Sequence, residues 1–536
     1  MSIAKPKYIF VTGGVASSLG KGIISSSIAR LLQARGYSVA IQKCDPYINV
    51  DPGTLNPYEH GECYVTNDGT EADLDLGHYE RFTAIPTSSA NTVTTGKIYQ
   101  SVINKERRGE YMGKTVQVIP HITDEIKRRI QLLSAKKIYD VIITEIGGTV
   151  GDIESLPYIE SVRQLRYQLG YRNTALVHLT LVPYMTASAE LKTKPTQHSV
   201  KALLENGLQP DVLVLRSEHH LPQEVRRKVA LFCNVDPQAV VESMDVPTIY
   251  EVPLKMREQN LDLVLLEKLN LPADKPSDMK AWEAFVEKVK NPSKRVDIAL
   301  VGKYVELPDA YKSIIESFVH AGAVNDCKVK LHLVAAEKVT PASVEELLGK
   351  MNGIMVAPGS GSRGIDGKLT AVKYARENKV PFFGICLGMQ CAVIEFARNV
   401  LGYENANSTE MAPTTCPVID VMEEQKGLSE GSTMRRGAYP CHLDPHSKVC
   451  RAYNATTIEE RHHHRYEFNN EYLDEFEAAG MRAVGMNPEM GLVEVVELDN
   501  HPWFVATQYH PEYSSNVLNP HPLFVAFVAA SLANKK

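Results

Sequence analysis

The sequence predicts an α/β protein built from two doubly wound domains. Continuous apolar runs alternate with helical patterns, and this alternation stops and restarts once along the chain. Such runs are too continuous for strands with one face in water, so they indicate parallel sheets covered by helices on both faces. The length of 536 residues also exceeds what one hydrophobic core supports.

The first half contains continuous apolar runs, several of them bounded by a glycine or an acid. They lie at 8–12, 38–41, 141–145, 175–182 and 211–215. Helical patterns between them, for example at 23–35 and 122–134, complete the alternation. The second half repeats it, with strands expected at 296–301, 328–334, 353–357, 380–385, 492–497 and 503–508.

The segment 271–295 separates the two series. It contains three prolines and several lysines in place of apolar strands, with one short helix expected at 282–289. We therefore expect a first domain at 1–270, a linker at 271–295 and a second domain at 296–536.

The bulk composition excludes several functional classes. A net charge of -6 leaves no basic excess for a general nucleic-acid surface. The nine cysteines show no C-x-x-C pair, and neighbouring side chains at His462–His464 diverge, so a surface or local ion-pairing role is expected there rather than a metal site. With no signal peptide and no membrane-length apolar run, we expect a reduced, cytoplasmic protein without membrane contact.

A glycine-rich loop, GGVASSLGKG at 13–22, lies between the first expected strand and the first helix. Backbone N–H groups at such a loop bind phosphate, and Lys21 can reach the transferred group. Five residues separate Gly14 from Gly20, one more than in the common P-loop, and Gly22 stands where a magnesium-binding hydroxyl is usual. The order of strand, loop, Gly-Lys and helix favours nucleotide binding over a loop without function.

Magnesium would then need carboxylates from elsewhere in the chain. Glu145 ends a buried strand at the expected ligand crevice, and Asp75 lies in the charged run 73–81. We expect these two to bind the metal together, whereas Asp73 alone is explained by a solvated turn. The polar run 192–198 fits a surface loop and an anion site equally well.

The pentapeptide 384–388, GICLG, has the form of a nucleophile elbow between an expected strand and an amphipathic helix at 389–398. Its glycines would let the backbone bend sharply and leave the Cys386 thiol exposed at a helix N-terminus that favours thiolate. A core cysteine between two packing glycines fits the pentapeptide as well, so partners elsewhere must decide.

His510 and Glu512, after the last expected strand, supply such partners. The histidine can act as base to Cys386 and the glutamate can orient it, which gives a Cys-His-Glu arrangement. The loop PGSGSRG at 358–364, with the N–H of Leu387, offers oxyanion donors for an acyl intermediate.

Seven segments, in order along nearly the whole chain, resemble the CTP synthase family of glutamine-dependent amidotransferases. They are 8–15 (YIFVTGGV), 43–53 (KCDPYINVDPG), 73–81 (DLDLGHYER), 145–157 (EIGGTVGDIESLP), 192–199 (KTKPTQHS), 302–313 (GKYVELPDAYKS) and 384–390 (GICLGMQ). The resemblance implies a P-loop synthetase domain of the dethiobiotin-synthetase type and a class I glutamine amidotransferase domain. The implied activity is a C–N ligase reaction that converts UTP to CTP with ATP and glutamine-derived ammonia, through a 4-phosphorylated UTP.

The resemblance also implies roles for residues of the synthetase domain. ATP would be bound by Ser18, Leu19, Gly20, Lys21, Gly22, Ile23, Asp75, Asp245 and Val246, and Mg²⁺ by Asp75 and Glu145. UTP, or CTP as feedback inhibitor, would contact Ser17, Asp152, Ile153, Glu154, Lys192, Thr193, Lys194, Pro195, Thr196, Gln197 and Lys228. Lys21 and Lys43 would stabilise charge during phosphoryl transfer, and Pro57, His60 and Cys63 would lie in a loop at the mouth of an ammonia channel.

In the glutaminase domain the resemblance implies Cys386, His510 and Glu512 as catalytic residues. Glutamine would be positioned by Gly359, Leu387, Gly388, Met389, Gln390, Glu410 and Arg465. GTP would be the allosteric activator, with Arg435 in the lid segment 433–437 that it influences. The family further implies a homotetramer and a capacity to form filaments.

Two segments depart from the family pattern. PGSGSRG at 358–364 is shorter than the familiar PGGFGxRG and lacks its phenylalanine, which leaves the oxyanion donors open. RHHHRYE at 461–467 replaces the commoner RHRHRYE and so removes one cation. Two alternatives remain: another two-domain ATP-dependent amidotransferase such as the cobyrinate amidases, and a filament-forming or partitioning-type scaffold.

Overall fold

The computed structural model describes residues 5–53, 55–421 and 434–535. Its contacts divide the chain into two compact units. Unit 1 comprises residues 1–54 and 75–286, and unit 2 comprises residues 55–74 and 287–536. Residues 55–74 therefore interrupt unit 1 in the sequence but make their contacts within unit 2. Among the described residues, every helix is too short or too polar to span a membrane.

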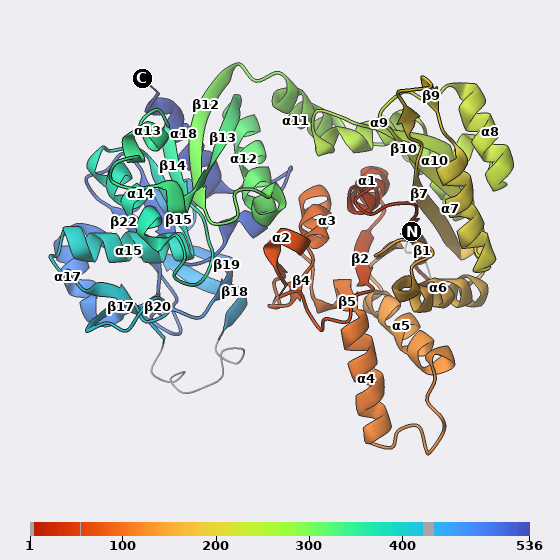
Figure 1. The fold of residues 1–536 in the computed structure, drawn as a ribbon, viewed down its shortest axis with the longest axis horizontal. Coiled ribbons are helices and arrows are strands. Elements are labelled where there is room, and N and C mark those ends of the chain that lie inside the picture. The colour runs from red at the N-terminus through yellow and green to blue at the C-terminus, as the bar shows by residue number, and fades with distance from the viewer. Residues whose placement is uncertain (1–4, 54, 422–433, 536) are drawn as a thin grey trace. The chain divides into compact units, whose positions relative to one another are not determined.

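Unit 1 is built on a parallel sheet. Its strands are β1 (Lys7–Gly13), β2 (Val39–Asp45), β5 (Thr92–Thr94), β6 (Val141–Ile146), β7 (Thr174–Leu181), β10 (Val212–Ser217) and β11 (Val240–Met244). In the described part of the chain these seven strands lie in the order β11-β10-β7-β1-β6-β2-β5 (Figure 1), and all neighbours pair in parallel. A small ribbon joins β8 (Tyr184–Met185) to β9 (Glu190–Leu191).

Helices cover both faces of this sheet, as the continuous apolar strands predict. They are α1 (Lys21–Ala34), α3 (Asp75–Thr83), α4 (Thr95–Arg107), α5 (Thr123–Ile130), α6 (Leu156–Leu169), α7 (Lys194–Glu205), α8 (Gln223–Cys233), α9 (Val252–Glu258), α10 (Leu261–Lys268) and α11 (Lys280–Lys290). Phe10, Ile142 and Leu176 pack with side chains of α4, α5 and α6, whereas α1 contacts α3, α9 and the other side of the sheet (Figure 1).

Unit 2 contains a larger, mixed sheet. Its strands are β12 (Lys294–Gly302), β13 (Cys327–Ala335), β14 (Gly353–Val356), β15 (Phe382–Ile385), β18 (Arg435–Leu443), β19 (Thr457–His464), β21 (Met481–Met486), β22 (Val493–Leu498) and β23 (Phe504–Thr507). Within the described ranges the order is β13-β12-β14-β15-β23-β22-β21-β18-β19. The first five strands are parallel, and the rest form an antiparallel extension in which the sequence predicted only the strand β22.

The remaining elements of unit 2 cover this sheet or flank it. They are strands β3 (Tyr64–Val65), β4 (Glu71–Ala72), β16 (Ala406–Ser408), β17 (Cys416–Asp420) and β20 (Glu467–Phe468), and helices α2 (Pro57–His60), α12 (Lys312–Val324), α13 (Val344–Leu348), α14 (Ile365–Glu377), α15 (Leu387–Asn399), α16 (Lys448–Tyr453), α17 (Leu473–Ala478) and α18 (Pro522–Ala533). Val301, Val356 and Phe382 pack against α14 and α15, and their neighbours Leu300, Met355 and Phe383 pack against α12 and α18.

The predicted α/β class is confirmed, and every expected strand overlaps an observed one. The short helix expected at 282–289 is α11. Its Trp282 is 1% exposed, packs against Phe82, and donates its indole N–H to the carbonyl of Tyr250 at 2.7 Å. This helix is thus anchored on unit 1, while the domain boundaries at 270 and 296 stay predictions.

Candidate active sites

The glycine-rich loop follows β1 and leads into α1, as the sequence predicts. Gly20 caps the helix at a φ of +95°, which glycine adopts without strain. The Lys21 ammonium donates to the carbonyl of Gly148 at 2.7 Å. Burial lowers the pKa of Lys21, and the Glu145 carboxylate opposes this effect. A helix N-terminus with a lysine beside it is suited to binding phosphate.

The glycine at position 22, where a hydroxyl is usual, has a steric reason. A Cβ on Gly22 would lie 2.3 Å from Oδ1 of Asp75, which begins α3. The Asp75 carboxylate in turn pairs with Lys43 of β2. A larger residue at position 22 would therefore displace the Asp75 carboxylate, which lies beside the position where the common P-loop has a hydroxyl.

Glu145 lies near the end of β6, is 1% exposed, and accepts a hydrogen bond from the hydroxyl of Tyr79. Burial, with the neighbouring Asp75 carboxylate, raises the pKa of Glu145 to about 8. The structure therefore brings Asp75 and Glu145 close to each other and to Lys21 and Lys43. Tyr79 was missed at the sequence level because a tyrosine inside a charged helix carries no signal of its own.

His178 of β7 is a second group that sequence reasoning missed. Its Nδ1 and Nε2 lie 2.8 Å from the hydroxyls of Thr12 and Ser199. Burial, with the nearby Lys21, lowers the pKa of His178 to about 3, so the ring is neutral. A Cβ on Gly14 would lie 1.6 Å from Ser199 Oγ, so the glycine lets the loop pack against this histidine–serine pair.

The residues expected to contact UTP fall into separate groups. Lys192 pairs with Glu190, and Lys228 on α8 is close enough to help lower the pKa of that carboxyl, after Lys192 and Ser188. In the next residues, Thr193 Oγ1 accepts from Gln197 at 3.0 Å, and Thr196 is bonded to Thr180 at 2.8 Å. Asp152, Ile153 and Glu154 are exposed, and no ion pair of the described residues joins them to the lysines.

The remaining residues expected at ATP lie at two places. Ser18, Leu19, Gly20, Lys21, Gly22 and Ile23 form the end of the loop and the first turn of α1, directly after Ser17, which was expected at UTP. Asp245 and Val246 follow β11, and Asp245 pairs with Arg216. Arg216 also donates to the carbonyl of Met244 at 3.3 Å, which holds the end of β11.

The pentapeptide 384–388 forms a sharp turn between β15 and α15. The left-handed φ of +53° falls on Cys386 itself, not on a glycine, so a non-glycine residue holds the strained conformation. The glycines serve close packing instead: a Cβ on Gly384 would lie 2.8 Å from Gly388 C and O, and one on Gly388 2.3 Å from Val356 O. The expected exposed thiol is wrong, because Cys386 is only 5% exposed.

His510 and Glu512 lie beside this turn. His510 Nδ1 is 2.7 Å from Glu512 Oε1, and both side chains are buried. Burial opposes protonation, but Glu512 and Cys386 raise the pKa of His510 to about 10. The Nε2 atom has no hydrogen bond of standard geometry among the described residues, and the Cys386 thiol donates to the carbonyl of His463 at 3.9 Å. The three groups predicted as a Cys-His-Glu set are thus brought together.

Two lysines, which sequence reasoning missed, hold the shortened loop 358–364. Lys303 donates to the carbonyls of Ser360 and, at 2.8 Å, of Gly361. Lys368 donates to the carbonyl of Ala357 at 2.7 Å, and burial lowers the pKa of Lys368 to about 8. On the other side of the loop, the Gly361 N–H donates to Glu410 at 2.6 Å.

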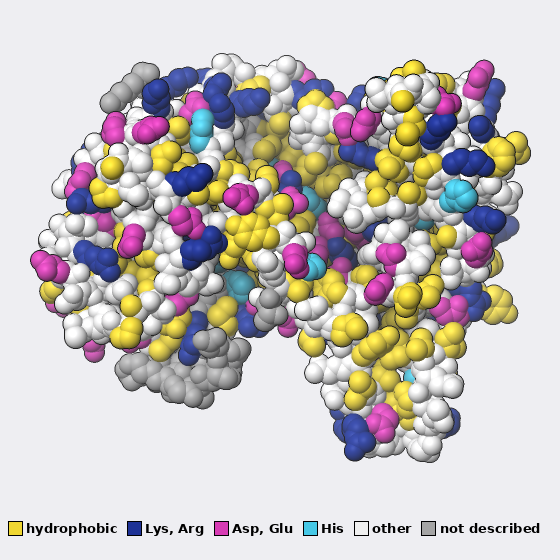
Figure 2. All heavy atoms as spheres, in the orientation of Figure 1, with side chains coloured by type: hydrophobic (Ala, Val, Ile, Leu, Met, Phe, Trp, Pro, Cys, Tyr) yellow, Lys and Arg dark blue, Asp and Glu magenta, His cyan; other side chains and the backbone are white. Residues whose placement is uncertain are grey.

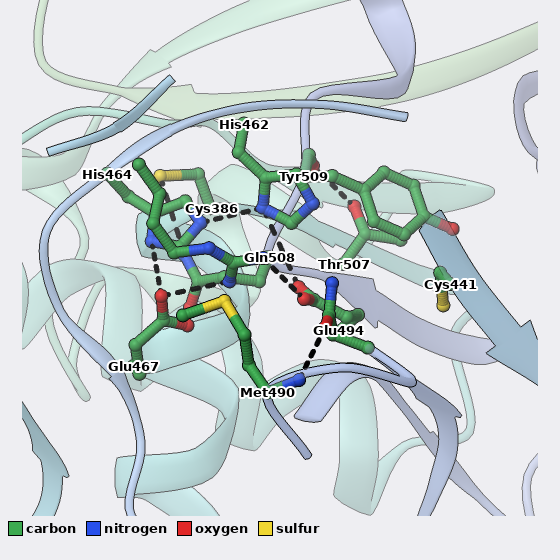
Figure 3. A network of polar contacts seen from close by, with 12 residues as sticks. Cys386, Cys441, His462, His464, Glu467, Met490, Glu494, Thr507, Gln508 and Tyr509 are labelled. Atoms are coloured by element: carbon green, nitrogen blue, oxygen red, sulfur yellow. Dashed lines mark hydrogen bonds and ion pairs between the residues drawn. The ribbon is translucent and has the colours of Figure 1, made fainter. Parts of the chain in front are cut away.

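Beneath the thiol lies a buried polar network (Figure 3). Arg435 donates to Glu467 at 3.0 Å and to Glu494 at 2.9 Å, and none of the three side chains is more than 4% exposed. Burial, with Glu494 adding to it and Arg435 opposing, raises the pKa of Glu467 to about 8. His462 and His464 hydrogen-bond to each other at 2.8 Å at its edge.

Burial lowers the pKa of both His462 and His464, and each ring packs near a carboxylate of this network. Of the two expected roles, the surface role is wrong for these buried residues, whereas the local contacts with carboxylates and the divergence of neighbouring side chains are confirmed. His463 points the other way along β19 and meets Glu71 at 2.7 Å. The start of the segment 433–437, which precedes Arg435, lies outside the described residues.

The residues expected to position glutamine line the same region. Leu387, Gly388, Met389 and Gln390 form the first turn of α15, and Gln390 Nε2 donates to the carbonyl of Tyr466 at 3.2 Å. Arg465 lies over the Tyr466 ring at 5.6 Å from its centroid. Gln508 was missed, although its Nε2 lies 3.7 Å from Cys386 Sγ (Figure 3).

Two family models and full-length relatives match nearly the whole chain. The family described as CTP synthase N-terminus matches residues 7–271, and glutamine amidotransferase class-I matches residues 306–530. The CTP synthase of Flavobacterium johnsoniae is 62% identical over 533 residues, which are 99% of each chain. This chain belongs to the CTP synthase family. The CTP synthase of Bacteroides fragilis is 63% identical over 99% of this chain and 100% of its own.

A solved structure of the Trypanosoma brucei CTP synthase glutaminase domain with bound acivicin is 34% identical, covering 44% of this chain and 94% of that one at a TM-score of 0.43. The resemblance to the CTP synthase family is thus confirmed by full-length relatives. Those relatives do not favour the alternative of another two-domain amidotransferase. The roles of individual residues stay predictions, because the comparisons do not test them.

Proposed function

We propose that this member of the CTP synthase family converts UTP to CTP, and that the phosphate loop and the Cys386 turn perform the two half-reactions. The observation that carries the proposal is the meeting of Cys386, His510 and Glu512 in unit 2 of a chain whose unit 1 holds Lys21 at a phosphate loop. A thiol, a base and an orienting carboxylate form the arrangement that cleaves amides.

In the proposed synthetase reaction, the γ-phosphoryl group of ATP moves to O4 of UTP and makes that oxygen a good leaving group. Lys21 and Lys43 would stabilise the negative charge spread over the transferred group. Ammonia then attacks C4, the C4–O4 bond breaks, and phosphate leaves. His178 would keep the loop in position without adding charge, since its ring is neutral.

The cation proposed for this site is Mg²⁺, held by Asp75 and Glu145. Their fit rests on the donors: Asp75 and Glu145 supply hard carboxylate oxygens, and because burial and the Asp75 carboxylate raise the pKa of Glu145 to about 8, a cation there would favour its ionised form. When bound, Mg²⁺ would neutralise charge on the ATP phosphates. The ATP contacts at 18–23, 245 and 246 and the UTP contacts at 17, 152–154, 192–197 and 228 are proposed with it.

In the proposed glutaminase reaction, the Cys386 sulfur attacks the side-chain amide carbon of glutamine and the C–N bond breaks. His510 gives its proton to the departing nitrogen, which leaves as ammonia. Water then attacks the glutamyl thioester, with His510 as base, and releases glutamate. Gly359, Glu410 and Arg465, with 387–390 of α15, are proposed to position the substrate.

We also propose the regulatory and cellular features that the resemblance implies: activation by GTP, feedback inhibition by CTP, a homotetramer with a capacity for filaments, and a place in the cytoplasm. Supporting association, Figure 2 shows hydrophobic side chains gathered near α4 and α5, and the exposed large hydrophobic residues include Ile103 of α4 and Met112, Val118 and Ile119 in the segment between the two helices.

The proposal is tested by following conversion of UTP to CTP with ATP, Mg²⁺ and either glutamine or ammonium, with and without GTP. Cys386→Ala should abolish synthesis from glutamine and keep synthesis from ammonium, whereas Cys416→Ala, as a thiol control, should keep both. Lys21→Ala should lose both syntheses and still form the thioester. Loss of both syntheses in Cys386→Ala, in a protein with wild-type melting behaviour, would refute the division between the two sites.

A further inference from the structure

Cys63, Glu71 and His463 form a cluster outside the proposed catalytic set. Their nearest ligand atoms, a thiol sulfur, a carboxylate oxygen and an imidazole nitrogen, all lie within 4.8 Å of one another. Glu71 is 8% exposed and the other two are half-buried. These residues come from parts of unit 2 that are nearly 400 positions apart, so the fold rather than the sequence assembles them.

A docked hairpin holds two of the three groups in place. β3 and β4 pair antiparallel, with Val65 opposite Glu71, and Cys63, two residues before Val65, lies on the same face of the hairpin as Glu71. Arg461 of β19 donates to the carbonyl of Val65 at 3.0 Å, and the Ala438 N–H of β18 donates to Asn67 at 2.9 Å. The hairpin is thereby fixed against the strand that carries the third group, His463.

We propose that Cys63, Glu71 and His463 bind one Zn²⁺ ion, and that the bound ion inhibits glutamine hydrolysis at Cys386. Sulfur, nitrogen and oxygen donors together suit zinc better than magnesium or calcium. Zinc ligands in a tetrahedron lie roughly 3.3 to 3.8 Å apart, so shifts of about 1 Å close this cluster around an ion. Three protein ligands leave the fourth position to water.

The charges of the cluster are compatible with an ion. His463 Nε2 and Glu71 Oε1 now share a hydrogen bond of 2.7 Å, which two bonds to zinc would replace. The Cys63 thiol would lose its proton to solvent and bind as thiolate. Arg436 lies 3.4 Å from Glu71 Oε1, so with thiolate, carboxylate, Arg436 and Zn²⁺ together the local charge is near +1.

Contacts run from the cluster to both catalytic groups. The Cys63 carbonyl accepts from the Tyr513 hydroxyl at 3.1 Å, and the Tyr513 ring stacks on His510 at 5.1 Å. The His463 carbonyl accepts from the Cys386 thiol at 3.9 Å. An ion that draws Cys63 and His463 together therefore shifts the contacts of both Cys386 and His510. This step rests on the proposed function of Cys386 as the nucleophile.

The binding test uses the reduced, metal-free full chain, titrated with Zn²⁺ against a chromophoric chelator and checked by metal analysis. The wild type and the half-buried thiol control Cys416→Val should bind one more equivalent than Cys63→Val. His463→Gln should lower the affinity for that additional Zn²⁺ ion at least about tenfold. Cys63→Ser, nearly the same size, guards against loss of folding, and melting curves are compared for all.

The variant Cys386→Ala separates zinc binding from catalysis. It should still bind the additional equivalent of Zn²⁺, whether or not Cys386 is the nucleophile. Loss of the equivalent in Cys386→Ala, or its persistence in Cys63→Val and Cys63→Ser, would overturn the site. In the second test, glutamate release is measured with glutamine alone. Zn²⁺ should inhibit wild type and Cys416→Val reversibly, and Cys63→Val should resist. Equal inhibition of Cys63→Val, or binding without inhibition, would overturn the link to Cys386.

Discussion

Replacing Glu512 by glutamine tests how His510 keeps its proton. The carboxylate lies 2.7 Å from Nδ1, and both side chains are buried. Burial alone lowers the pKa of His510, but Glu512 and Cys386 raise it to about 10. Glutamine keeps the size of the side chain and removes its charge. An opposite charge at this range shifts a pKa by about 1 to 3 pH units, so the pKa of His510 should fall by that amount.

The assay is the pH profile of glutamate release from glutamine alone, between neutral and strongly alkaline pH. Because the protonated imidazole supplies the proton to departing ammonia, the rate falls as pH rises through the pKa of His510. The wild-type alkaline limb should lie near pH 10, and that of Glu512→Gln about 1 to 3 pH units lower.

Tyr513→Phe is the matched control. The Tyr513 ring stacks on His510, and removal of its hydroxyl alters the surroundings of the imidazole without removing a carboxylate. Its alkaline limb should coincide with that of the wild type. A limb that stays in place in Glu512→Gln, or that moves as far in Tyr513→Phe, would refute the assignment of the raised pKa to the carboxylate.

Two further substitutions test the remaining geometry. Asp75→Asn should raise the Mg²⁺ concentration needed for half-maximal CTP formation, because one of two carboxylates is lost; an unchanged Mg²⁺ dependence would contradict the ligand assignment. Gly388→Ala should lower both the thermal midpoint and glutamate release, because the new Cβ would lie 2.3 Å from Val356 O and overpacking costs about 1 to 3 kcal/mol. Gly402→Ala meets no atom within 4 Å but strains the backbone at a φ of +79°, so it should lower the thermal midpoint and keep glutamate release; equal loss of glutamate release in both variants would contradict the packing argument.

How far the fold follows from sequence depends on what each strand buries. The parallel strands, such as β1 and β14, bury apolar side chains on both faces and therefore stand out as continuous apolar runs. β18 and β19 do not, because they bury Arg435, His462 and His464 against carboxylates. A strand that buries paired charges has the composition of a surface strand, so local pattern does not reveal it.

The same contrast holds at the sites. Cys386, Lys21 and the carboxylate Asp75 lie in motifs whose local order already predicts their chemistry. Lys303 and Lys368 carry no such signal, because only the fold supplies the loop carbonyls that receive their ammonium groups. The pairing of residues 55–74 with unit 2 is likewise invisible locally, since it depends on contacts with β18 and β19.

The hydrogen bonds that hold the loop 358–364 restrict which backbone N–H groups can stabilise an oxyanion, a choice that the sequence left open. In a planar trans peptide the carbonyl and the next N–H point in opposite directions. Lys303 holds the Ser360 carbonyl on one side, so the Gly361 N–H faces the other side, where Glu410 accepts it at 2.6 Å. While Glu410 holds that N–H, Gly361 cannot also stabilise an oxyanion. The donors that we propose are therefore the N–H groups of Gly359, at a φ of +154°, and Leu387.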